Sequence, residues 1–315
     1  MSHMSTPFNS EKIISHRIND TQMSTFLVGF DINDKGSKEY RLKPFIEKLT
    51  HVIHEFAFGF HNGESTENTE TLSKLTEAAK SIYKIDAFQK IKDIYANEGE
   101  LDDSVEDKYL RRGEFGELIL HLLLRDFYKT TPLLSKIYFK DSFGHTVHGF
   151  DAIHIQEETK TLWLGESKLY KDGKRGIKEL VKDIKEHFKS DYLESEFLII
   201  SKKIKLFDNI PEKDHWLDIM SKSSKLIDQL ETINIPLLCT FNSSLFTKHE
   251  DENSADFIKE YIAEMTELKE YFDAKNDHPL KTKLNIILIL FPVQNKLELV
   301  KGLHHKLSLL QALGE

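Results

Sequence analysis

The chain has 315 residues, of which 30% are charged, and 52 acidic against 43 basic side chains give a formal net charge of −9 at pH 7. This composition is typical of a folded globular protein and excludes a disordered chain, a collagen-like fibre and a small disulfide scaffold. The single cysteine, Cys239, excludes an internal disulfide and a Cys-rich zinc site, and fits a reducing cytoplasm. The longest apolar run, 284–293, is too short to cross a membrane, and the acidic balance argues against a protein that coats nucleic acid.

Residues 1–105 are predicted to form an N-terminal accessory domain that is mostly helical and contacts a partner. Residues 1–3 resemble a cloning remnant before Met4, and no signal peptide is expected. The patterns predict, in chain order, a strand over 26–33, a turn at 34–36 and amphipathic helices over 42–58 and 72–91. The acidic stretch 98–107 is the best candidate linker, so a boundary is expected near residue 105.

Residues 106–315 show helices that alternate with short apolar strands. The predicted helices are 113–128, 174–189, 214–232, 254–274 and 295–313. The predicted strands are 134–140, 148–156, 161–169, 196–201, 235–241 and 284–292. This alternation, opened by a hairpin, indicates an α/β or α+β domain with a sheet flanked by helices.

The hairpin over 148–169 carries the most informative residues. If the chain turns about Glu158 and Thr159, opposed residues have numbers that sum to 317, and isoleucines of the first strand face leucines of the second. The same register places Asp151 opposite Glu166, with Lys168 on the same face. Two opposed carboxylates repel one another and stay ionised most easily around a cation.

This arrangement predicts a metal site for Mg²⁺ or Mn²⁺. Asp151, Glu166 and the backbone carbonyl of Ser167 would supply oxygen ligands, and substrate phosphate and water would complete the coordination. Lys168 would position or deprotonate a water, or stabilise the charge that develops on phosphorus. His145, His148 and His154 lie near the hairpin and could supply a further ligand or a proton carrier. The simpler alternative is that Glu166 and Lys168 form a solvated ion pair.

The helix predicted over 113–128 has an apolar face that should pack on the sheet and an opposite polar stripe. Glu114, Glu117, His121 and Arg125 make up this stripe, and Gly113 and Gly116 permit a close approach near Glu117. The alternative for the stripe is an ordinary exposed face.

A basic segment follows directly after Lys168. Residues 168–189 contain eight lysine or arginine residues and four acidic ones, a local excess of +4 in a chain of −9. Such a stripe beside a buried face is placed to follow a phosphate backbone. The predicted DNA contacts are Lys171, Lys174, Arg175, Lys178 and Lys182. The alternative is a solvated helix stabilised by its own ion pairs.

Three motifs occur in a recognisable order: 112–117 (Arg-Gly-Glu-Phe-Gly-Glu), 149–151 (Gly-Phe-Asp) and 165–168 (Gly-Glu-Ser-Lys). Their order of helix Glu, strand Asp and strand Glu-x-Lys resembles the PD-(D/E)xK nuclease signature, although Gly-Phe precedes the Asp where the signature has Pro. The segment from about 108 to 205 resembles the HamA family, the nuclease subunits of Hachiman anti-phage defence.

The resemblance implies a restriction-endonuclease-like mixed sheet and a metal-dependent DNase that works in bacterial immunity with a helicase subunit, HamB. By the same resemblance, Asp151 and Glu166 would hold metal, Lys168 would assist catalysis and Glu117 would support the metal or its water. Because glycine-rich phosphate loops are absent, no nucleotide cofactor is expected on this chain. Two alternatives stay open: an inactive nuclease fold that serves as a nucleic-acid-binding or scaffolding subunit, and an RNA-cleaving toxin.

Overall fold

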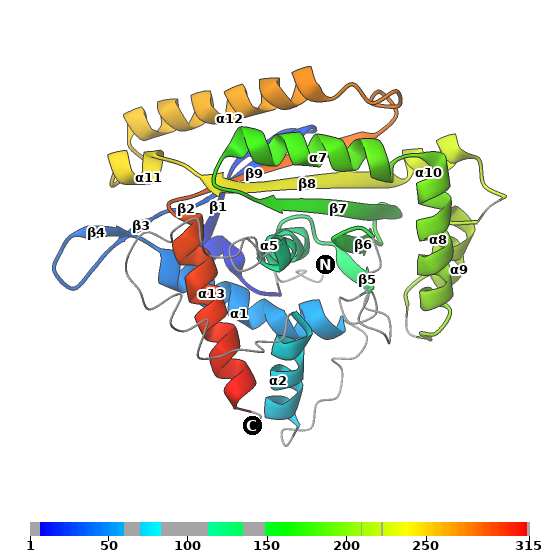
Figure 1. Cartoon of the computed structure of the whole chain (residues 1–315), viewed down its shortest axis with the longest axis horizontal. Helices are drawn as coiled ribbons and strands as arrows, with labels where there is room; N and C mark the ends of the chain where they lie inside the picture. The colour runs from blue at the N-terminus through cyan, green and yellow to red at the C-terminus, as the bar shows by residue number, and fades with distance from the viewer. Residues whose placement is uncertain are drawn as a thin grey trace, which may run out of the picture.

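A computed structural model describes residues 7–59, 70–82, 113–134, 149–208, 210–221 and 223–313. Its centre is a seven-stranded mixed sheet in the order β1-β2-β9-β8-β7-β6-β5 (Figure 1). The strands are β1 (Ile14–Asn19), β2 (Met23–Val28), β5 (Thr131–Leu134), β6 (Ala152–Gln156), β7 (Thr161–Leu169), β8 (Ile233–Asn242) and β9 (Asn285–Val293). The four central strands β2, β9, β8 and β7 are parallel, and the outer strands on both sides are antiparallel to their neighbours.

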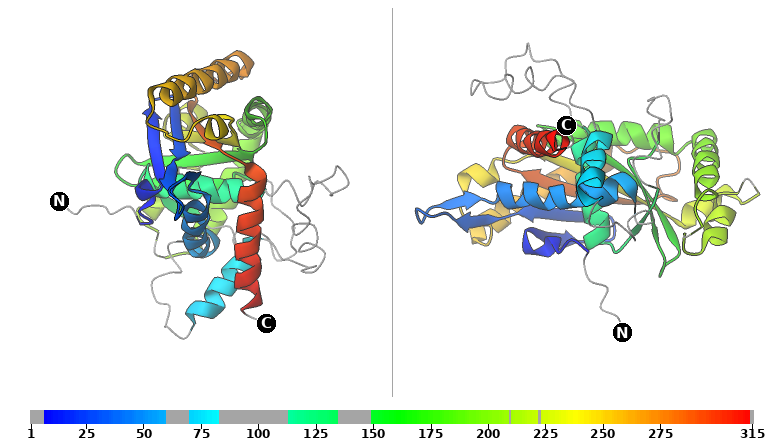
Figure 2. Two further views of the ribbon diagram at one scale, coloured as in Figure 1. Left: turned by 90° about the vertical axis from the view of Figure 1, so that its left-hand side faces the viewer. Right: turned by 90° about the horizontal axis from the view of Figure 1, so that it is seen from below.

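The central strands are apolar on both faces, since β8 is buried along nearly its whole length. A parallel sheet of this kind needs helices on both sides. Helices α7 (Gly173–His187) and α12 (Ala255–Lys275) cover one face, and α5 (Gly113–Asp126) and α1 (Leu42–Phe58) cover the other (Figures 1 and 2). Helices α2 (Thr71–Ile82) and α13 (Lys296–Ala312) pack beside α1.

The smaller elements lie around this core. They are the 3₁₀ helix η1 (Ser10–Lys12), the hairpin β3 (Phe30–Ile32) and β4 (Lys38–Tyr40), and helices α8 (Ser190–Ile204), α9 (Lys213–Ile219), α10 (Leu226–Glu231) and α11 (Leu245–Lys248). Within the described part of the chain, no helix is both long enough and apolar enough to cross a membrane.

The prediction of a mixed α/β or α+β architecture is confirmed, and so are the bounds of the helix over 42–58 and the strand over 161–169. The strand predicted over 196–201 is wrong, because this segment lies inside α8. The buried residues Leu193, Phe197, Ile200 and Ile204 recur at helical spacing. A short apolar run does not distinguish a strand from the buried part of a helix.

Two further predictions need correction. The helix predicted over 214–232 is two short helices, α9 and α10, separated by a serine-rich stretch in which the Ser224 hydroxyl donates to the carbonyl of Asp218. The strand predicted over 26–33 is divided between β2 and β3.

The N-terminal segment contributes directly to the main sheet, since β1 and β2 join it next to β9. Helix α1 packs against α5 and α13. The boundary predicted near residue 105 lies outside the described residues, as do most of the strand predicted over 134–140 and the end of the helix predicted over 72–91. The division into an accessory and a nuclease-like domain therefore stays a prediction.

Candidate active site

The hairpin of β6 and β7 has the predicted register. Residues 152–156 pair with 161–165, and the isoleucines face the leucines as expected. Asp151 lies one residue before this ladder, so its side chain is free to bend toward β7. Its Oδ2 accepts hydrogen bonds from the Ser167 amide at 2.8 Å and from the Ser167 hydroxyl at 2.9 Å. Ser167, predicted as a ligand through its carbonyl, here orients Asp151 through its two donors.

Alternation along β7 directs Glu166 and Lys168 toward α7. There, Asp183 forms an ion pair with Lys168, with 2.5 Å between Oδ2 and Nζ. One helical turn further on, His187 places its Nδ1 2.6 Å from Oε1 of Glu166. We call Asp151, Glu166, Lys168, Asp183 and His187 the α7-side cluster.

Glu166 has the most strongly perturbed electrostatics of this cluster. Its side chain is buried, with 2% of the residue exposed. Burial, then the negative charges of Asp151 and Asp183, raise its pKa well above the ordinary value for a glutamate, against the opposing effect of Lys168. Burial also lowers the pKa of His187. Without a further cation, both directions favour a protonated Glu166 that donates to a neutral His187.

Lys168 stays positively charged in this setting. Burial alone would lower its pKa, but the adjacent Asp183 carboxylate, with Asp151 and Glu166 nearby, raises the pKa above the usual value for lysine. A lysine with a raised pKa is a poor base at neutral pH. Of the two roles left open by the sequence, stabilisation of developing negative charge is therefore the better supported.

Glu117 reaches the same region from the other side of the sheet. It lies on α5, which crosses β7 closely, because a β-carbon at Gly116 would lie 3.1 Å from the Ser167 hydroxyl oxygen. Glu117 is buried, and it is the weakest of the acidic neighbours that raise the pKa of Glu166. The structure therefore brings the four predicted catalytic residues into one neighbourhood, and their catalytic role stays a prediction.

The donor atoms of this neighbourhood suit a hard cation. Three acidic side chains surround Glu166 and one lysine opposes them, so an added positive charge would relieve their repulsion. Among the described residues, no three Asp, Glu, His or Cys side chains converge as the ligands of one metal ion. Mg²⁺ is commonly held by one or two carboxylates, with water and substrate oxygens filling its other positions. Asp151 and Glu166 would meet that requirement, and Oδ1 of Asp151 has no hydrogen-bond partner among the described residues.

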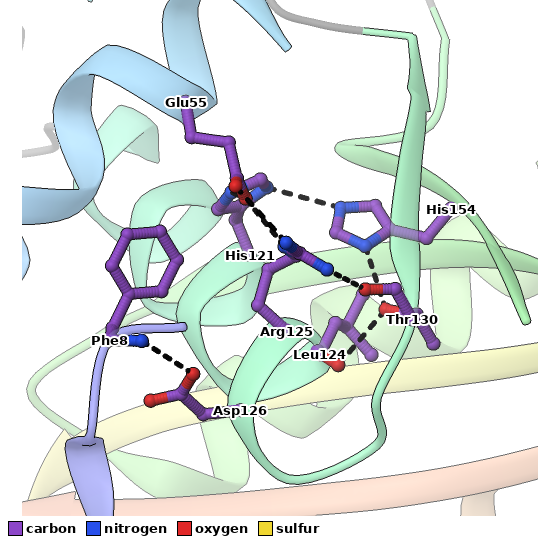
Figure 3. Close-up of polar contacts among 8 residues, drawn as sticks. All are labelled: Phe8, Glu55, His121, Leu124, Arg125, Asp126, Thr130 and His154. Carbon is purple, nitrogen blue, oxygen red and sulfur yellow. Dashed lines mark hydrogen bonds and ion pairs between the residues drawn. The ribbon is translucent and has the colours of Figure 1, made fainter. Parts of the chain in front are cut away.

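A second polar cluster lies on the α5 side of the sheet (Figure 3). Arg125 donates to both carboxylate oxygens of Glu55, at 2.6 and 3.2 Å, and His121 lies 3.0 Å from Oε1 of the same carboxylate. His154 of β6 connects the other nitrogen of His121, at 3.2 Å, with the Thr130 hydroxyl, at 2.8 Å. We call these five residues the α5-side cluster.

The hydrogen bonds of the α5-side cluster run in one direction. The Thr130 hydroxyl donates to the carbonyl of Leu124, so it accepts from Nδ1 of His154. Nε2 of His154 then accepts from Nδ1 of His121, and Nε2 of His121 lies 3.0 Å from the Glu55 carboxylate. Burial raises the pKa of Glu55, but His121 and Arg125 outweigh it and lower the pKa to about 2. Burial, and then the electrostatic effects of His121 and Arg125, lower the pKa of His154.

The α5-side cluster corrects two expectations. Glu117, His121 and Arg125 of the predicted polar stripe are buried, so the alternative of an exposed face is wrong for them. His154 points away from the α7-side cluster and holds a structural position between α5 and β6. His145 and His148 lie outside the described residues.

The predicted DNA contacts lie at the surface. Lys171, Lys174, Arg175, Lys178 and Lys182 are all exposed. Lys174 pairs with Glu267 of α12, and Arg175 lies 5.7 Å from the ring centroid of Tyr170. The Asp172 side chain caps α7 by accepting from the Arg175 amide, at 2.7 Å, which fixes where the basic stripe begins.

Sequence reasoning missed the contribution of α7 and α8 to the site. It counted Asp183 only among the four acidic residues of the basic segment 168–189 and gave no role to His187. Tyr192 of α8 stacks on the His187 ring, with centroids 4.5 Å apart, and burial raises the pKa of the nearby Glu196 to about 7. One feature of the sequence could have indicated this role. Asp183 directly precedes Ile184, a residue of the buried apolar face of α7, so its side chain lies at the edge of that face.

Comparison with known proteins identifies the family of this chain. No curated protein matches it in sequence. The HamA family model matches residues 5–307, which is most of the 315 residues. The chain therefore belongs to the HamA family and is a component of the Hachiman defence system.

Proposed function

We propose that this protein is a Mg²⁺- or Mn²⁺-dependent DNA endonuclease, the effector of a cytoplasmic anti-phage system that works with a helicase subunit, HamB. The observation that carries the proposal is the excess of carboxylates around the buried Glu166, beside a lysine that stays charged. Family membership supports the defence role.

The residues divide into distinct tasks. Asp151 and Glu166 would hold the metal ion, with the Ser167 carbonyl and Glu117 as further oxygen donors to it or to its water. A bound divalent ion would polarise the scissile phosphate and lower the pKa of a water molecule. Lys168 would stabilise the negative charge that develops on the phosphate oxygens. Ser167, through its amide and hydroxyl, orients Asp151.

The exposed basic residues that follow β7 support DNA as the substrate. Lys171, Lys178 and Lys182 lie on the surface of the segment directly after the Glu-x-Lys strand. Lysines in such positions bind phosphates without reading sequence, so this contact predicts affinity that falls with salt.

Incubation of the purified protein, alone and with its helicase partner, with plasmid DNA and Mg²⁺ tests the proposal. We expect cleavage that chelation abolishes and that Glu166→Ala and Lys168→Ala variants lack. Equal cleavage by these variants would exclude this site as the active centre. A parallel RNA substrate separates a DNase from an RNA-cleaving toxin.

The second candidate is an inactive nuclease fold that binds nucleic acid or serves as a scaffold. The contact between His187 and Glu166 favours it, because it occupies one carboxylate oxygen, and so does the absence of a three-ligand cluster in the described residues. Calorimetric titration with Mn²⁺ separates the two candidates. An active centre should bind the ion and lose it in Asp151→Ala, whereas a scaffold should bind it in neither form.

A further inference from the structure

Helix α7 contacts the candidate centre at two matched points. Asp183 and His187 are separated by one turn of α7, a rise of about 6 Å. Glu166 and Lys168 are separated by two residues on β7, a rise of about 7 Å on the same face. Because these repeats nearly coincide, one helix face pairs with both side chains, Asp183 with Lys168 and His187 with Glu166.

The two α7 side chains are themselves held in place. The His187 ring stacks on Tyr192 and meets the Phe150 ring edge to face, with centroids 5.8 Å apart. Asp183 has 16% of its side chain exposed, and Lys168 has 24%, so water screens this ion pair only in part. Without the contacts of Asp183 with Lys168 and of His187 with Glu166, the lysine and glutamate side chains would populate several rotamers.

We propose that Asp183 and His187 are positioning residues, which hold Lys168 and Glu166 in the orientation that metal binding and phosphate cleavage require. This inference rests on the proposed function. It assigns to α7 an inner acidic and imidazole face that organises the centre, beside its outer basic face. Neither residue needs to touch the substrate to act in this way.

Metal binding provides the first test and does not depend on activity. His187→Ala should weaken Mn²⁺ binding about tenfold in calorimetry, because residues that orient metal ligands typically contribute ten- to a hundredfold to affinity. His187→Gln keeps a side chain able to reach Glu166 and should recover part of the loss. Glu186→Gln, an exposed residue on the same helix, is the control and should leave binding unchanged.

Cleavage kinetics provide the second test. Asp183→Asn should lower kcat about ten- to a hundredfold with little change in KM for DNA, since Lys168 would lose its orientation without a loss of surface contacts. Asp183→Glu retains the carboxylate and should restore much of the rate. Glu186→Gln removes the same charge from the same helix and should keep the wild-type kcat. Melting curves confirm that each variant is folded.

Three outcomes would overturn the inference in recognisable ways. Wild-type values in both Asp183→Asn and His187→Ala would refute positioning and leave the nuclease proposal standing. A higher kcat in Asp183→Asn would show that this carboxylate restrains Lys168. A wild-type protein that neither binds Mn²⁺ nor cleaves with its partner would refute the proposed function and this inference with it.

Discussion

The two polar clusters on opposite sides of β6 and β7 are built from similar residues but differ in charge balance. In the α5-side cluster, the Glu55 carboxylate receives hydrogen bonds from both Arg125 and His121, and its pKa falls to about 2. In the α7-side cluster, several carboxylates share one lysine, and the pKa of Glu166 rises. The first cluster is electrostatically complete and the second lacks positive charge.

This difference indicates which cluster stabilises the fold and which one is the candidate functional site. Buried groups that satisfy one another hold α1, α5 and β6 together and leave no capacity for a ligand (Figure 3). Buried like charges destabilise a protein unless a ligand relieves them, so their presence points to a functional site. Substitutions in either cluster, each compared with a matched control variant, test this difference in charge balance.

The largest effect is expected from Arg125→Met. This change removes the guanidinium from the Glu55 carboxylate inside the α5-side cluster and leaves His121 as its donor, and breaking such a buried pair typically costs about 3–5 kcal/mol of unfolding free energy. Denaturant unfolding measures it. Arg175→Met, at an exposed position, should change stability by less than about 1 kcal/mol. Equal effects of the two changes would contradict a structural role for the α5-side cluster.

Thr130→Val should have a smaller effect on the same cluster. The change removes the hydroxyl that accepts from His154 and donates to the carbonyl of Leu124. The buried Nδ1 of His154 then loses this partner, while the Leu124 carbonyl still accepts from the Thr130 amide, at 3.1 Å. We expect a loss of about 1–3 kcal/mol in thermal or denaturant unfolding. Thr159→Val, in the exposed turn between β6 and β7, serves as the control. No difference between the two variants would show that the hydrogen-bond chain contributes nothing.

Glu166 should make the metal-free protein less stable as the pH rises. Because its pKa is raised in the folded state, the folded protein binds this proton more tightly than the unfolded chain does. The resulting stability is present below about pH 4.5 and is lost as the pH rises through the folded-state pKa, at about 1.4 kcal/mol per pH unit over that interval. The melting temperature of the wild type should therefore fall as the pH rises, and that of Glu166→Gln should depend less on pH.

Glu196 gives an internal comparison for this pH dependence. Its pKa is raised to about 7 by burial, so its contribution is lost between about pH 4.5 and 7. Glu196→Gln should reduce the pH dependence of the melting temperature within that interval. Glu186→Gln, at an exposed position, should leave the whole curve of melting temperature against pH unchanged. Identical curves of melting temperature against pH for the wild type and Glu166→Gln would mean that the pKa of Glu166 is not raised in the folded protein.

The smallest effect is expected from Lys178→Gln on the outer face of α7. Removal of one phosphate contact should weaken DNA binding a few-fold and reduce the slope of log affinity against log salt by about one. Fluorescence anisotropy at several salt concentrations measures both. Lys43→Gln, an exposed residue on α1 across the sheet, should change neither. Equal slopes of log affinity against log salt for the wild type, Lys178→Gln and Lys43→Gln would show that Lys178 of α7 does not contact DNA.

Much of the site could be predicted from sequence because strand alternation is a local property. The register of the hairpin and the shared face of Glu166 and Lys168 follow from a period of two. The position of Asp151 could be predicted only in part, since it lies beyond the ladder and turns to Ser167. The strand prediction failed at 196–201, where a short apolar run carries no reliable period.

The sequence therefore predicted the sheet-and-helix architecture, the hairpin over 148–169 and the shared face of Glu166 and Lys168 from spacing along the chain. The role of Glu117 came from the family resemblance, and the catalytic roles of all four residues stay predictions. Only the tertiary structure decided which polar groups meet across elements. It placed Asp183 and His187 against β7, and Glu55 of α1 against α5, a residue 66 positions from His121. Such contacts depend on how helices pack on the sheet, and the charge balance of a buried cluster follows from that packing.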